Sequence, residues 1–247
     1  MATSNMSIGK QSTLNLQLRV NGGEFDEPER AKAKKPSKIA KKARVYPAAQ
    51  PDWSNLNCLH RNTLPPRSYF FLYDSEKAAL KAAASHDLSE SKSQLLSGTW
   101  KFDLSSSPFE GPIDFHSPDY DTSDWADIKV PGMWQCQGFG KGPQYTNVDF
   151  PWPVDPPNIP FDDNECGRYV TMFHVKRQAE DYQTRLRFEG VDAAFTVWVN
   201  GFKLGYSQGS RNPSEFDITD VIQPDKKNIL AVEVYQRCDG SYIEDQV

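Results

Sequence analysis

Residues 195–206 read Phe-Thr-Val-Trp-Val-Asn-Gly-Phe-Lys-Leu-Gly-Tyr. Asn200-Gly201 in the middle of this stretch is a strong signal for a β-hairpin, because both central residues of the favoured two-residue turn need a positive φ angle. The stretch therefore predicts one strand at 195–199 and a return strand at 202–206.

Further stretches on both sides of this hairpin show apolar residues alternating with polar ones, which is the pattern of half-buried strands. Trp100, Phe102 and Leu104, for example, share one face of such a stretch. The other expected strands lie at 96–104, 125–130, 167–175, 184–188 and 228–235. Many short strands at this spacing predict an all-β jelly-roll sandwich over residues 95–247, incomplete at its C-terminus.

The part of the chain before residue 95 lacks this pattern and divides in two. Residues 1–50 contain many Ala, Lys and Ser and few aromatics, which predicts a disordered basic tail. Residues 51–94 are expected to form an extended arm interrupted by prolines. Within this arm, Ala and Leu residues behind Ser75, a favourable N-cap, predict one short helix at 75–85.

The composition excludes several classes of protein. Hydrophobic residues make up 38% and aromatic residues 12% of the 247 residues, so the chain can bury a core. No run approaches the roughly 18 apolar residues that a membrane span needs, and residues 1–30 lack the apolar segment of a secretory signal. We therefore expect a cytoplasmic protein with no membrane partner.

The net charge of −5 is unevenly distributed. Residues 1–50 hold ten Lys and Arg against four Asp and Glu, so the rest of the chain is acidic. An acidic body is a poor surface for nucleic acid, because phosphate binding needs clustered cations. The basic stretch at 32–44 leaves two interpretations open: a solvated, disordered leader, or a nuclear-localisation or RNA-binding signal.

The cysteines give no sign of a metal site or of a disulfide framework. Cys58, Cys136, Cys166 and Cys238 lie far apart and form no Cys-x-x-Cys pair. A structural zinc site usually draws its ligands from such short pairs. Reduced thiols in a cytoplasmic protein are therefore the expectation.

Two pairs of adjacent acids raise the question of a two-carboxylate hydrolase. The pairs are Asp162-Asp163 and Glu244-Asp245. Adjacent side chains on an extended segment point in opposite directions, so the members of such a pair do not face one cavity. We therefore expect loop acids rather than a catalytic pair at both places.

Several motifs, taken in order, resemble a known family. They are Gln144-Tyr145-Thr146-Asn147-Val148, Pro151-Trp152-Pro153-Val154-Asp155-Pro156-Pro157, Phe188-Glu189-Gly190-Val191-Asp192-Ala193-Ala194-Phe195, Trp198-Val199-Asn200-Gly201, Gly205-Tyr206-Ser207-Gln208-Gly209-Ser210-Arg211, Glu215-Phe216-Asp217 and Asp239-Gly240-Ser241-Tyr242-Ile243-Glu244-Asp245-Gln246. Their order and spacing resemble the N-terminal, galactose-binding-domain-like jelly roll of glycoside hydrolase family 2 β-galactosidases. The resemblance implies a carbohydrate-binding domain of an enzyme that hydrolyses terminal β-D-galactosyl residues.

The resemblance also implies one substrate-binding residue. Asn147 matches a family residue that reaches into the galactose pocket beside the catalytic barrel. Its amide can both donate to and accept from sugar hydroxyls, which suits that role. The alternative is an asparagine that only forms a turn.

A second implied site is a peripheral Mg²⁺ site. The residues that match the family's ligands are Asp52, Asn55, Gln208 and Asp239, with Cys58 at the position that offers a backbone carbonyl. An all-oxygen set with two carboxylates is what a hard cation prefers. The alternative is that Asp52 and Asp239 tie the arm to the sandwich by hydrogen bonds.

The chain departs from the family pattern after Gln246. The family has an Asp there that helps to bind the active-site Na⁺, and this chain has Val247. The family's catalytic barrel, with both catalytic glutamates and the catalytic Mg²⁺ ligands, needs about 250 further residues. We therefore expect no active-site Na⁺ or catalytic Mg²⁺ in this chain and no activity without a barrel or a complementing chain. The alternatives are a free-standing module that binds β-galactosides and a sandwich with a nucleic-acid-binding tail.

Overall fold

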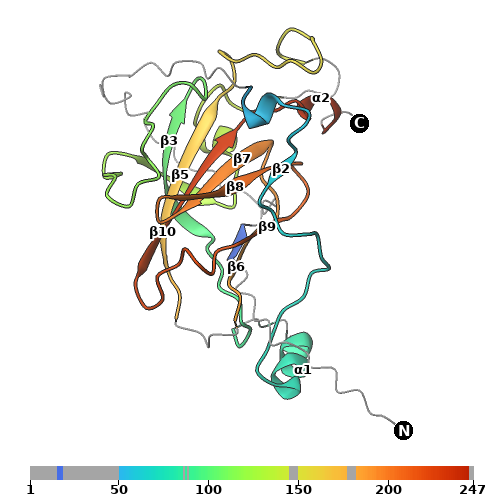
Figure 1. Ribbon diagram of the computed structural model, residues 1–247, viewed down its shortest axis with the longest axis vertical. Helices are drawn as coiled ribbons and strands as arrows, with labels where there is room; N and C mark the ends of the chain where they lie inside the picture. Colours follow the sequence, from blue (N-terminus) through green and yellow to red (C-terminus); the bar gives the residue numbers. More distant parts are fainter. Residues whose placement is uncertain are drawn as a thin grey trace.

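The computed structural model describes residues 50–85, 87, 89–144, 150–176 and 182–244, and the backbone of a strand at 16–18 (Figure 1). The strands are β1 (Leu16–Leu18), β2 (His60–Arg61), β3 (Gly98–Ser105), β4 (Ala126–Val130), β5 (Cys166–His174), β6 (Arg185–Phe188), β7 (Ala194–Val199), β8 (Phe202–Gln208), β9 (Ser214–Asp217) and β10 (Lys227–Tyr235). The helices in these residues are α1 (Glu76–Ser85) and α2 (Ser241–Glu244), with 3-10 turns at Asp52–Ser54 and Trp134–Gln137.

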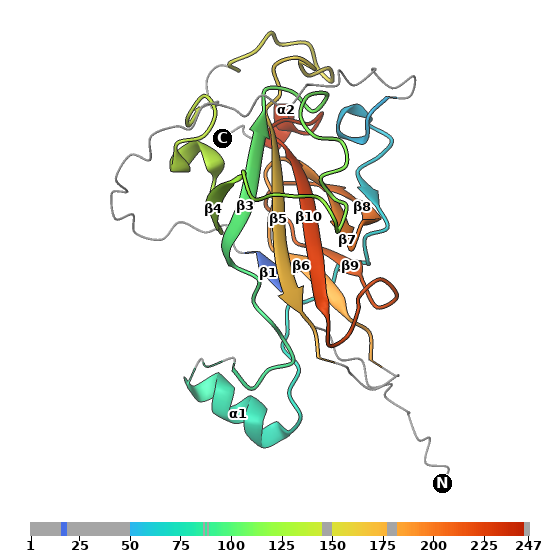
Figure 2. The ribbon, with the colours of Figure 1, turned by 90° about the vertical axis from the view of Figure 1, so that its left-hand side faces the viewer.

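The strands form two sheets that pack face to face (Figure 2). The larger sheet has the order β2-β8-β7-β10-β5-β3-β4, and the smaller one has the order β1-β6-β9. Phe188 on β6 and Phe216 on β9 contact Phe195 on β7, with ring centroids 4.6 and 6.0 Å apart. This two-layer arrangement confirms the predicted all-β jelly-roll sandwich.

Strand β10 lies in the middle of the larger sheet and is buried on both faces. Leu230 and Val232 point into the core between the sheets. Ile229 and Ala231 point to the opposite face, where they pack against Phe115 in the long connection between β3 and β4. That connection therefore covers the outer face of the sheet and completes a second, smaller apolar cluster.

The predicted hairpin is present as β7 and β8. Asn200 and Gly201 have φ angles of 51° and 85°, as the two-residue turn requires. All the strands predicted from alternation are present, and their ends differ from the predicted ones by at most two residues. The helix predicted at 75–85 is α1, and the Ser75 hydroxyl accepts from the Ala78 N–H at 3.2 Å as its N-cap.

Several short elements were not predicted. β2 and α2 have two and four residues, too few for periodicity to show, and β9 has a single apolar side chain, Phe216, so that no alternation marks it. β1 lies within the segment expected to be a disordered tail, and it pairs in parallel with β6. The structure therefore differs from that expectation at residues 16–18. The alternation of Leu14, Leu16, Leu18 and Val20 was the overlooked signal.

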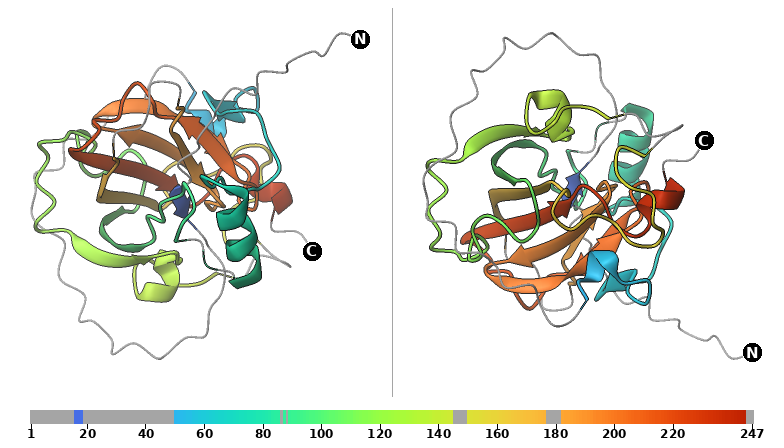
Figure 3. Two further views of the ribbon diagram at one scale, coloured as in Figure 1. Left: turned by 90° about the horizontal axis from the view of Figure 1, so that it is seen from below. Right: turned by 90° about the horizontal axis from the view of Figure 1, so that it is seen from above.

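The arm contributes directly to the sandwich. His60 and Arg61 form the edge strand β2, which pairs antiparallel with β8 (Figure 3). A Cβ atom on Gly205 of β8 would lie against the carbonyl oxygen of Arg61, so glycine allows the arm to approach this closely. Farther along the arm, the Leu64 N–H donates to the Glu215 carbonyl on β9 at 2.8 Å. The arm thus runs from the larger sheet to the smaller one.

Helix α1 lies beyond the end of the two sheets (Figures 1 and 2). Only Ala82 of its side chains is buried, and Leu80 is exposed. No helix in the described part of the chain is long and apolar enough to cross a membrane.

We predict that Asn228 at the start of β10 is a major contributor to stability. Its side chain is fully buried, accepts from Asn200 (2.8 Å) and the Gln223 N–H (2.7 Å), and donates to the carbonyls of Gln223 and Lys226 (both 3.0 Å). Asn228→Leu would leave these groups buried without partners and should lower the free energy of unfolding by about 2–4 kcal/mol in urea denaturation. The exposed Asn212→Leu should cost less than about 0.5 kcal/mol, and equal losses would contradict the prediction.

Candidate functional site

The arm meets the sandwich beside the C-terminal ends of β8 and β10. The backbone N–H of Asp239 donates to the carbonyl of Trp53 (3.0 Å), and the N–H of Gln208 donates to the carbonyl of Leu59 (3.3 Å). The Trp53 ring is buried and lies 5.9 Å from the ring of Tyr235. Backbone hydrogen bonds and one buried aromatic ring therefore hold the arm in place. We call this place the arm junction.

On the sandwich side of the arm junction, Gln208 and Asp239 bind each other. The Gln208 amide donates to Asp239 Oδ1 (2.8 Å), and the Tyr206 hydroxyl donates to Gln208 Oε1 (2.6 Å). Asp239 is only 6% exposed, and its Oδ2 is buried without a hydrogen-bond partner in the described part of the chain. Burial raises the pKa of the Asp239 carboxyl, because a charge is costly to remove from water.

On the arm side, an arginine binds the other carboxylate. Arg61 Nε donates to Asp52 Oδ2 and Arg61 Nη2 donates to Asp52 Oδ1, both at 2.7 Å. This pairing with Arg61, helped by a hydrogen bond from Cys58, holds the pKa of Asp52 below its usual value. Asn55 Oδ1 accepts from the Asn57 N–H (3.1 Å), and the Asn55 carbonyl accepts from the Cys58 N–H (2.7 Å).

The pKa values of two groups in the arm junction, the Cys58 thiol and the Tyr206 hydroxyl, depend on both carboxylates. Burial raises the pKa of the Cys58 thiol, and the charges of Asp52 and Asp239 raise it further. Burial also raises the pKa of Tyr206, and the same two carboxylates add to that effect. The structure therefore brings the residues expected to hold Mg²⁺ together. It also shows that the side chain of Asp52 binds Arg61 within the arm, while that of Asp239 binds Gln208 within the sandwich.

The donor set of the arm junction consists of oxygens. In the part of the chain that the structure describes, no three His, Cys, Asp and Glu side chains come together as a metal site. The arm junction instead offers two carboxylates, the amide oxygens of Asn55 and Gln208 and a main-chain carbonyl at Cys58. Hard divalent cations prefer such ligands, and the buried Asp239 Oδ2 is an acceptor that a cation would satisfy. The residues therefore fit a Mg²⁺ ion, although Arg61 covers Asp52.

Asn147 lies outside the described residues, but both ends of its loop are described. One buried arginine, Arg237, contacts them both. Its Nη2 donates to Gln144 Oε1 (2.8 Å), and its guanidinium lies 4.4 Å from the centre of the Trp152 ring. Arg237 also donates to the carbonyl of Asp163. The positions from which the Asn147 segment leaves and returns are thus linked through one side chain.

Tyr242 on α2 fixes the chain that follows this loop. Its hydroxyl donates to the Asn158 carbonyl (2.5 Å) and accepts from Trp152 Nε1 (3.3 Å) and the Asp155 N–H (3.2 Å). The ring of Phe150 packs on the ring of Tyr242, with centroids 5.2 Å apart. The short helix α2 therefore serves as an anchor for the loop.

Sequence reasoning missed the roles of Arg237 and Tyr242. Their loop partners Gln144 and Asn158 lie 93 and 84 residues away along the chain. No local pattern reports contacts over such distances. The signal that existed was the motif at 239–246, which includes Tyr242 but gives no indication of what its hydroxyl binds.

Two buried or half-buried acids near the loop are engaged in structural hydrogen bonds. Glu165 accepts from the Lys141 N–H (2.9 Å) and from Trp134 Nε1 (3.3 Å). Glu244 accepts from the N–H and the hydroxyl of Ser210, at 2.8 and 2.7 Å. These two carboxylates therefore hold loops in position, and Glu244 itself lies in the short helix α2 rather than in the loop that the sequence predicted.

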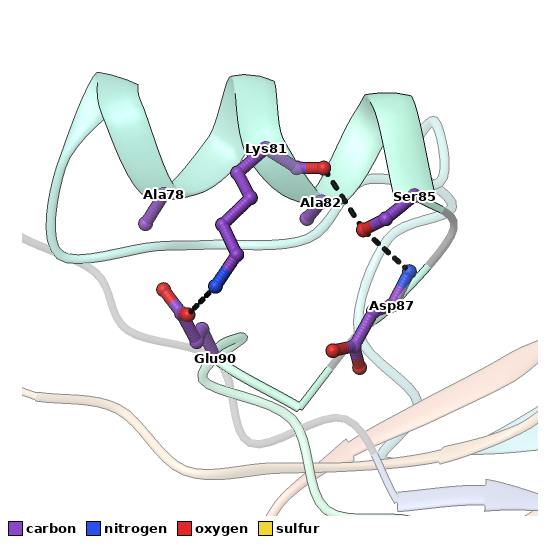
Figure 4. Close-up of a pocket in the computed structure, with 6 residues that line it drawn as sticks. All are labelled: Ala78, Lys81, Ala82, Ser85, Asp87 and Glu90. Atoms are coloured by element: carbon purple, nitrogen blue, oxygen red, sulfur yellow. Dashed lines mark hydrogen bonds and ion pairs between the residues drawn. The ribbon is translucent and has the colours of Figure 1, made fainter.

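A shallow hollow lies beside α1 (Figure 4). Its lining is Ala78, Lys81, Ala82, Ser85, Asp87 and Glu90. Lys81 and Glu90 form an ion pair across it (2.6 Å), and the Ser85 hydroxyl donates to the Lys81 carbonyl (2.9 Å). Lys81 thus binds both Glu90 and Ser85. The hollow is therefore the place where helix α1 contacts the segment that follows it.

The sequence model of the glycosyl hydrolase family 2 sugar-binding domain matches residues 93–247. The match covers more than half of the chain and includes every strand except β1 and β2. The fold and the match together define the class as a sugar-binding sandwich. The chain belongs to glycosyl hydrolase family 2, through its sugar-binding domain.

Curated relatives include bacterial β-galactosidases. The chain is 39% identical over 196 residues to that of Halalkalibacterium halodurans, matching 78% of this chain and 19% of the relative. It is 39% identical over 195 residues to that of Psychromonas ingrahamii (79% and 18%) and 45% identical over 158 residues to that of Clostridium acetobutylicum (62% and 17%). The chain spans less than a fifth of the length of these relatives.

Among solved structures, similar chains include two bacterial β-glucuronidases. The enzyme of Faecalibacterium prausnitzii matches with a TM-score of 0.40 and 24% identity, over 56% of this chain and 20% of that one. The enzyme of Ruminococcus gnavus matches with a TM-score of 0.41 and 19% identity, again over 56% and 20%.

We predict that Arg237 is a principal anchor of the Asn147 loop. Arg237→Met keeps an unbranched side chain, shorter than that of arginine, but leaves the Gln144 amide oxygen and the Asp163 carbonyl without their charged donor. The free energy of unfolding in urea should fall by about 2–4 kcal/mol. Arg211→Met is the matched control, because that side chain is 71% exposed and should cost less than about 0.5 kcal/mol. An Arg237 variant as stable as the control would show that the anchor is dispensable.

Proposed function

We propose that this chain is the sugar-binding domain of a β-galactosidase and recognises terminal β-D-galactosyl residues. The observation that carries the proposal is its similarity to curated β-galactosidases, which reaches 39% identity over 196 residues, or 78% of this chain. Family membership supports sugar binding in general. The preference for galactose is the further step that the relatives suggest.

In this proposal Asn147 contacts the sugar. An amide side chain donates two hydrogen bonds and accepts two, which suits a ligand rich in hydroxyl groups. The described surroundings support the role, because Arg237 and Tyr242 hold the chain immediately before and after residues 145–149. A binding residue on a loop needs such support if its amide is to meet the sugar in one orientation.

The chain itself is proposed to be non-catalytic, with hydrolysis carried out by a barrel or a complementing chain as its partner. A retaining glycosidase needs a carboxylic acid and a nucleophilic carboxylate about 5–5.5 Å apart on rigid supports. Glu165 and Glu244 are instead bound to backbone N–H groups and to side chains of the loops. We also propose that the protein is cytoplasmic, which the free thiols of Cys58, Cys136, Cys166 and Cys238 in the described segments support.

We further propose that the arm junction binds Mg²⁺. Asp52, Asn55, Gln208 and Asp239 would supply side-chain oxygens, and Cys58 its main-chain carbonyl. The ion would place a positive charge beside the buried Asp239 carboxylate, which is hydrogen-bonded to the neutral amide of Gln208. Because these ligands come from both the arm and the sandwich, the ion would strengthen the docking of the arm.

We predict weak galactose binding that depends on Asn147. Two or three hydrogen bonds, each worth about 0.5–1.5 kcal/mol, give a Kd on the order of tens of millimolar. Chemical-shift titration of the purified chain with galactose should show such binding, and Asn147→Ala should abolish it. Glucose, which differs at one hydroxyl, should bind more weakly.

Asn212→Ala is the matched control, since Asn212 is exposed and lies outside the loop. Equal binding by the Asn147 variant and the control would contradict the role of Asn147. A sub-millimolar Kd would favour a free-standing carbohydrate-binding module. The same preparation should leave a chromogenic galactoside intact, and turnover that persists after repurification would show that the chain is an enzyme by itself.

We predict that Mg²⁺ raises the Tm of the chain, because it binds the folded form alone. At about ten times its Kd a ligand adds about 1.4 kcal/mol, or about 3–6 °C for a domain of this size. Asp239→Asn should remove most of the gain in thermal melting, whereas the exposed Asp119→Asn should retain it. Identical melting curves in EDTA and in millimolar Mg²⁺ would count against the site.

A further inference from the structure

The two carboxylates at the arm junction are compensated very differently. Asp52 receives two charge-assisted hydrogen bonds of 2.7 Å from Arg61, in a bidentate geometry that is among the strongest in proteins. Asp239 is held by neutral groups instead, namely the Gln208 amide on Oδ1 and the backbone of Gly240, and its Oδ2 has no partner within normal hydrogen-bond geometry in the described part of the chain. The Arg61 guanidinium therefore occupies the Asp52 oxygens that a cation shared by both carboxylates would have to bind.

The side chain of Arg61 can separate from Asp52 while its backbone stays in place. Its backbone is fixed in β2, where Arg61 pairs with Tyr206 of β8. Its side chain is 51% exposed, while that of Asp52 is 19% exposed. A guanidinium with this exposure can return to water at little cost, because water replaces most of its hydrogen bonds. The ion pair thus has short, bidentate contacts, but breaking it costs little free energy.

Magnesium and the guanidinium cannot use the Asp52 carboxylate in the same way at the same time. Mg²⁺ needs near-octahedral oxygens at about 2.0–2.1 Å, and a carboxylate whose two oxygens both accept in the plane from one arginine has its best lone pairs occupied. A divalent ion bound beside Arg61 would also repel its positive charge.

We propose that Arg61 is a built-in competitor for the divalent cation at the arm junction. This inference rests on the proposed Mg²⁺ site. When the ion is scarce, Arg61 neutralises Asp52 and the arm stays docked through its backbone hydrogen bonds. When the ion is abundant, it displaces the guanidinium from Asp52 and joins Asp52 to Asp239. Arg61 therefore sets the cation concentration at which the exchange takes place.

The test is a Mg²⁺ titration of five chains from a chelated starting buffer, with Tm and calorimetric heat as readouts. They are the unmodified chain, Arg61→Gln, Arg61→Lys, Arg211→Gln and Asp239→Asn. Arg61→Gln removes the competing charge and should lower the half-saturating Mg²⁺ concentration about two- to fivefold, the usual strength of an exposed ion pair. Arg61→Lys, with a single point of charge, should give an intermediate value. Arg211→Gln removes an exposed arginine from the ion pair with Asp192 and should match the unmodified chain.

The outcomes separate this inference from the site on which it rests. If Arg61→Gln and the unmodified chain saturate at the same concentration, or the variant needs more Mg²⁺, and Asp239→Asn still abolishes the response, the competition is refuted and the site stands. If the unmodified chain and Arg61→Gln both fail to respond, the site and the competition are refuted together.

A second measurement uses the unmodified chain, so that the result does not depend on the folding of a variant. The Nε–H signal of Arg61 should be protected from exchange with water in EDTA and should lose that protection as Mg²⁺ is added. A signal that keeps its protection at saturating Mg²⁺ would overturn the proposal.

Discussion

Strand β10 is apolar on both faces, and the rest of the sandwich follows from the need to cover it. Leu230 and Val232 require a layer on one face, which β6 and β9 supply. Ile229 and Ala231 require a layer on the other, which the connection carrying Phe115 supplies. Exposing either row to water would cost about 25 cal/mol for each Å² of apolar surface. The two-sided burial of one strand therefore explains why a long loop is packed on the outer face of the sheet.

The chain immediately after β10 connects the two candidate sites. Arg237 sends its side chain to the ends of the Asn147 loop, while the backbone of Asp239 holds the arm through Trp53. Cys238 lies between them and is fully buried. Because β10 is rigidly paired on both sides, this short segment positions both features with the precision of the sheet. The proposed sugar contact and the proposed ion site are thus both positioned by the segment that follows β10.

The strands could be predicted because alternation is a local property that each strand carries in its own sequence. Asn200-Gly201 and the row Trp100, Phe102 and Leu104 are examples, and the structure has both where they were expected. β9 escaped prediction because only one of its four side chains, Phe216, is apolar, which gives no alternation to detect. The grouping of the expected Mg²⁺ ligands came from the order of motifs, which carries long-range information that alternation lacks. It did not disclose the part played by Arg61.

The sequence by itself determined the all-β class, the main strands, the hairpin turn and the family resemblance, because these depend on side chains that are neighbours along the chain. Only the tertiary structure decided how each polar group is satisfied. Arg61 covers both oxygens of Asp52, and Asp239 keeps one buried oxygen that has no partner among the residues that the structure describes. The reason is that a hydrogen bond needs atoms within about 3 Å, and only the docking of the arm on β8 brings these residues that close.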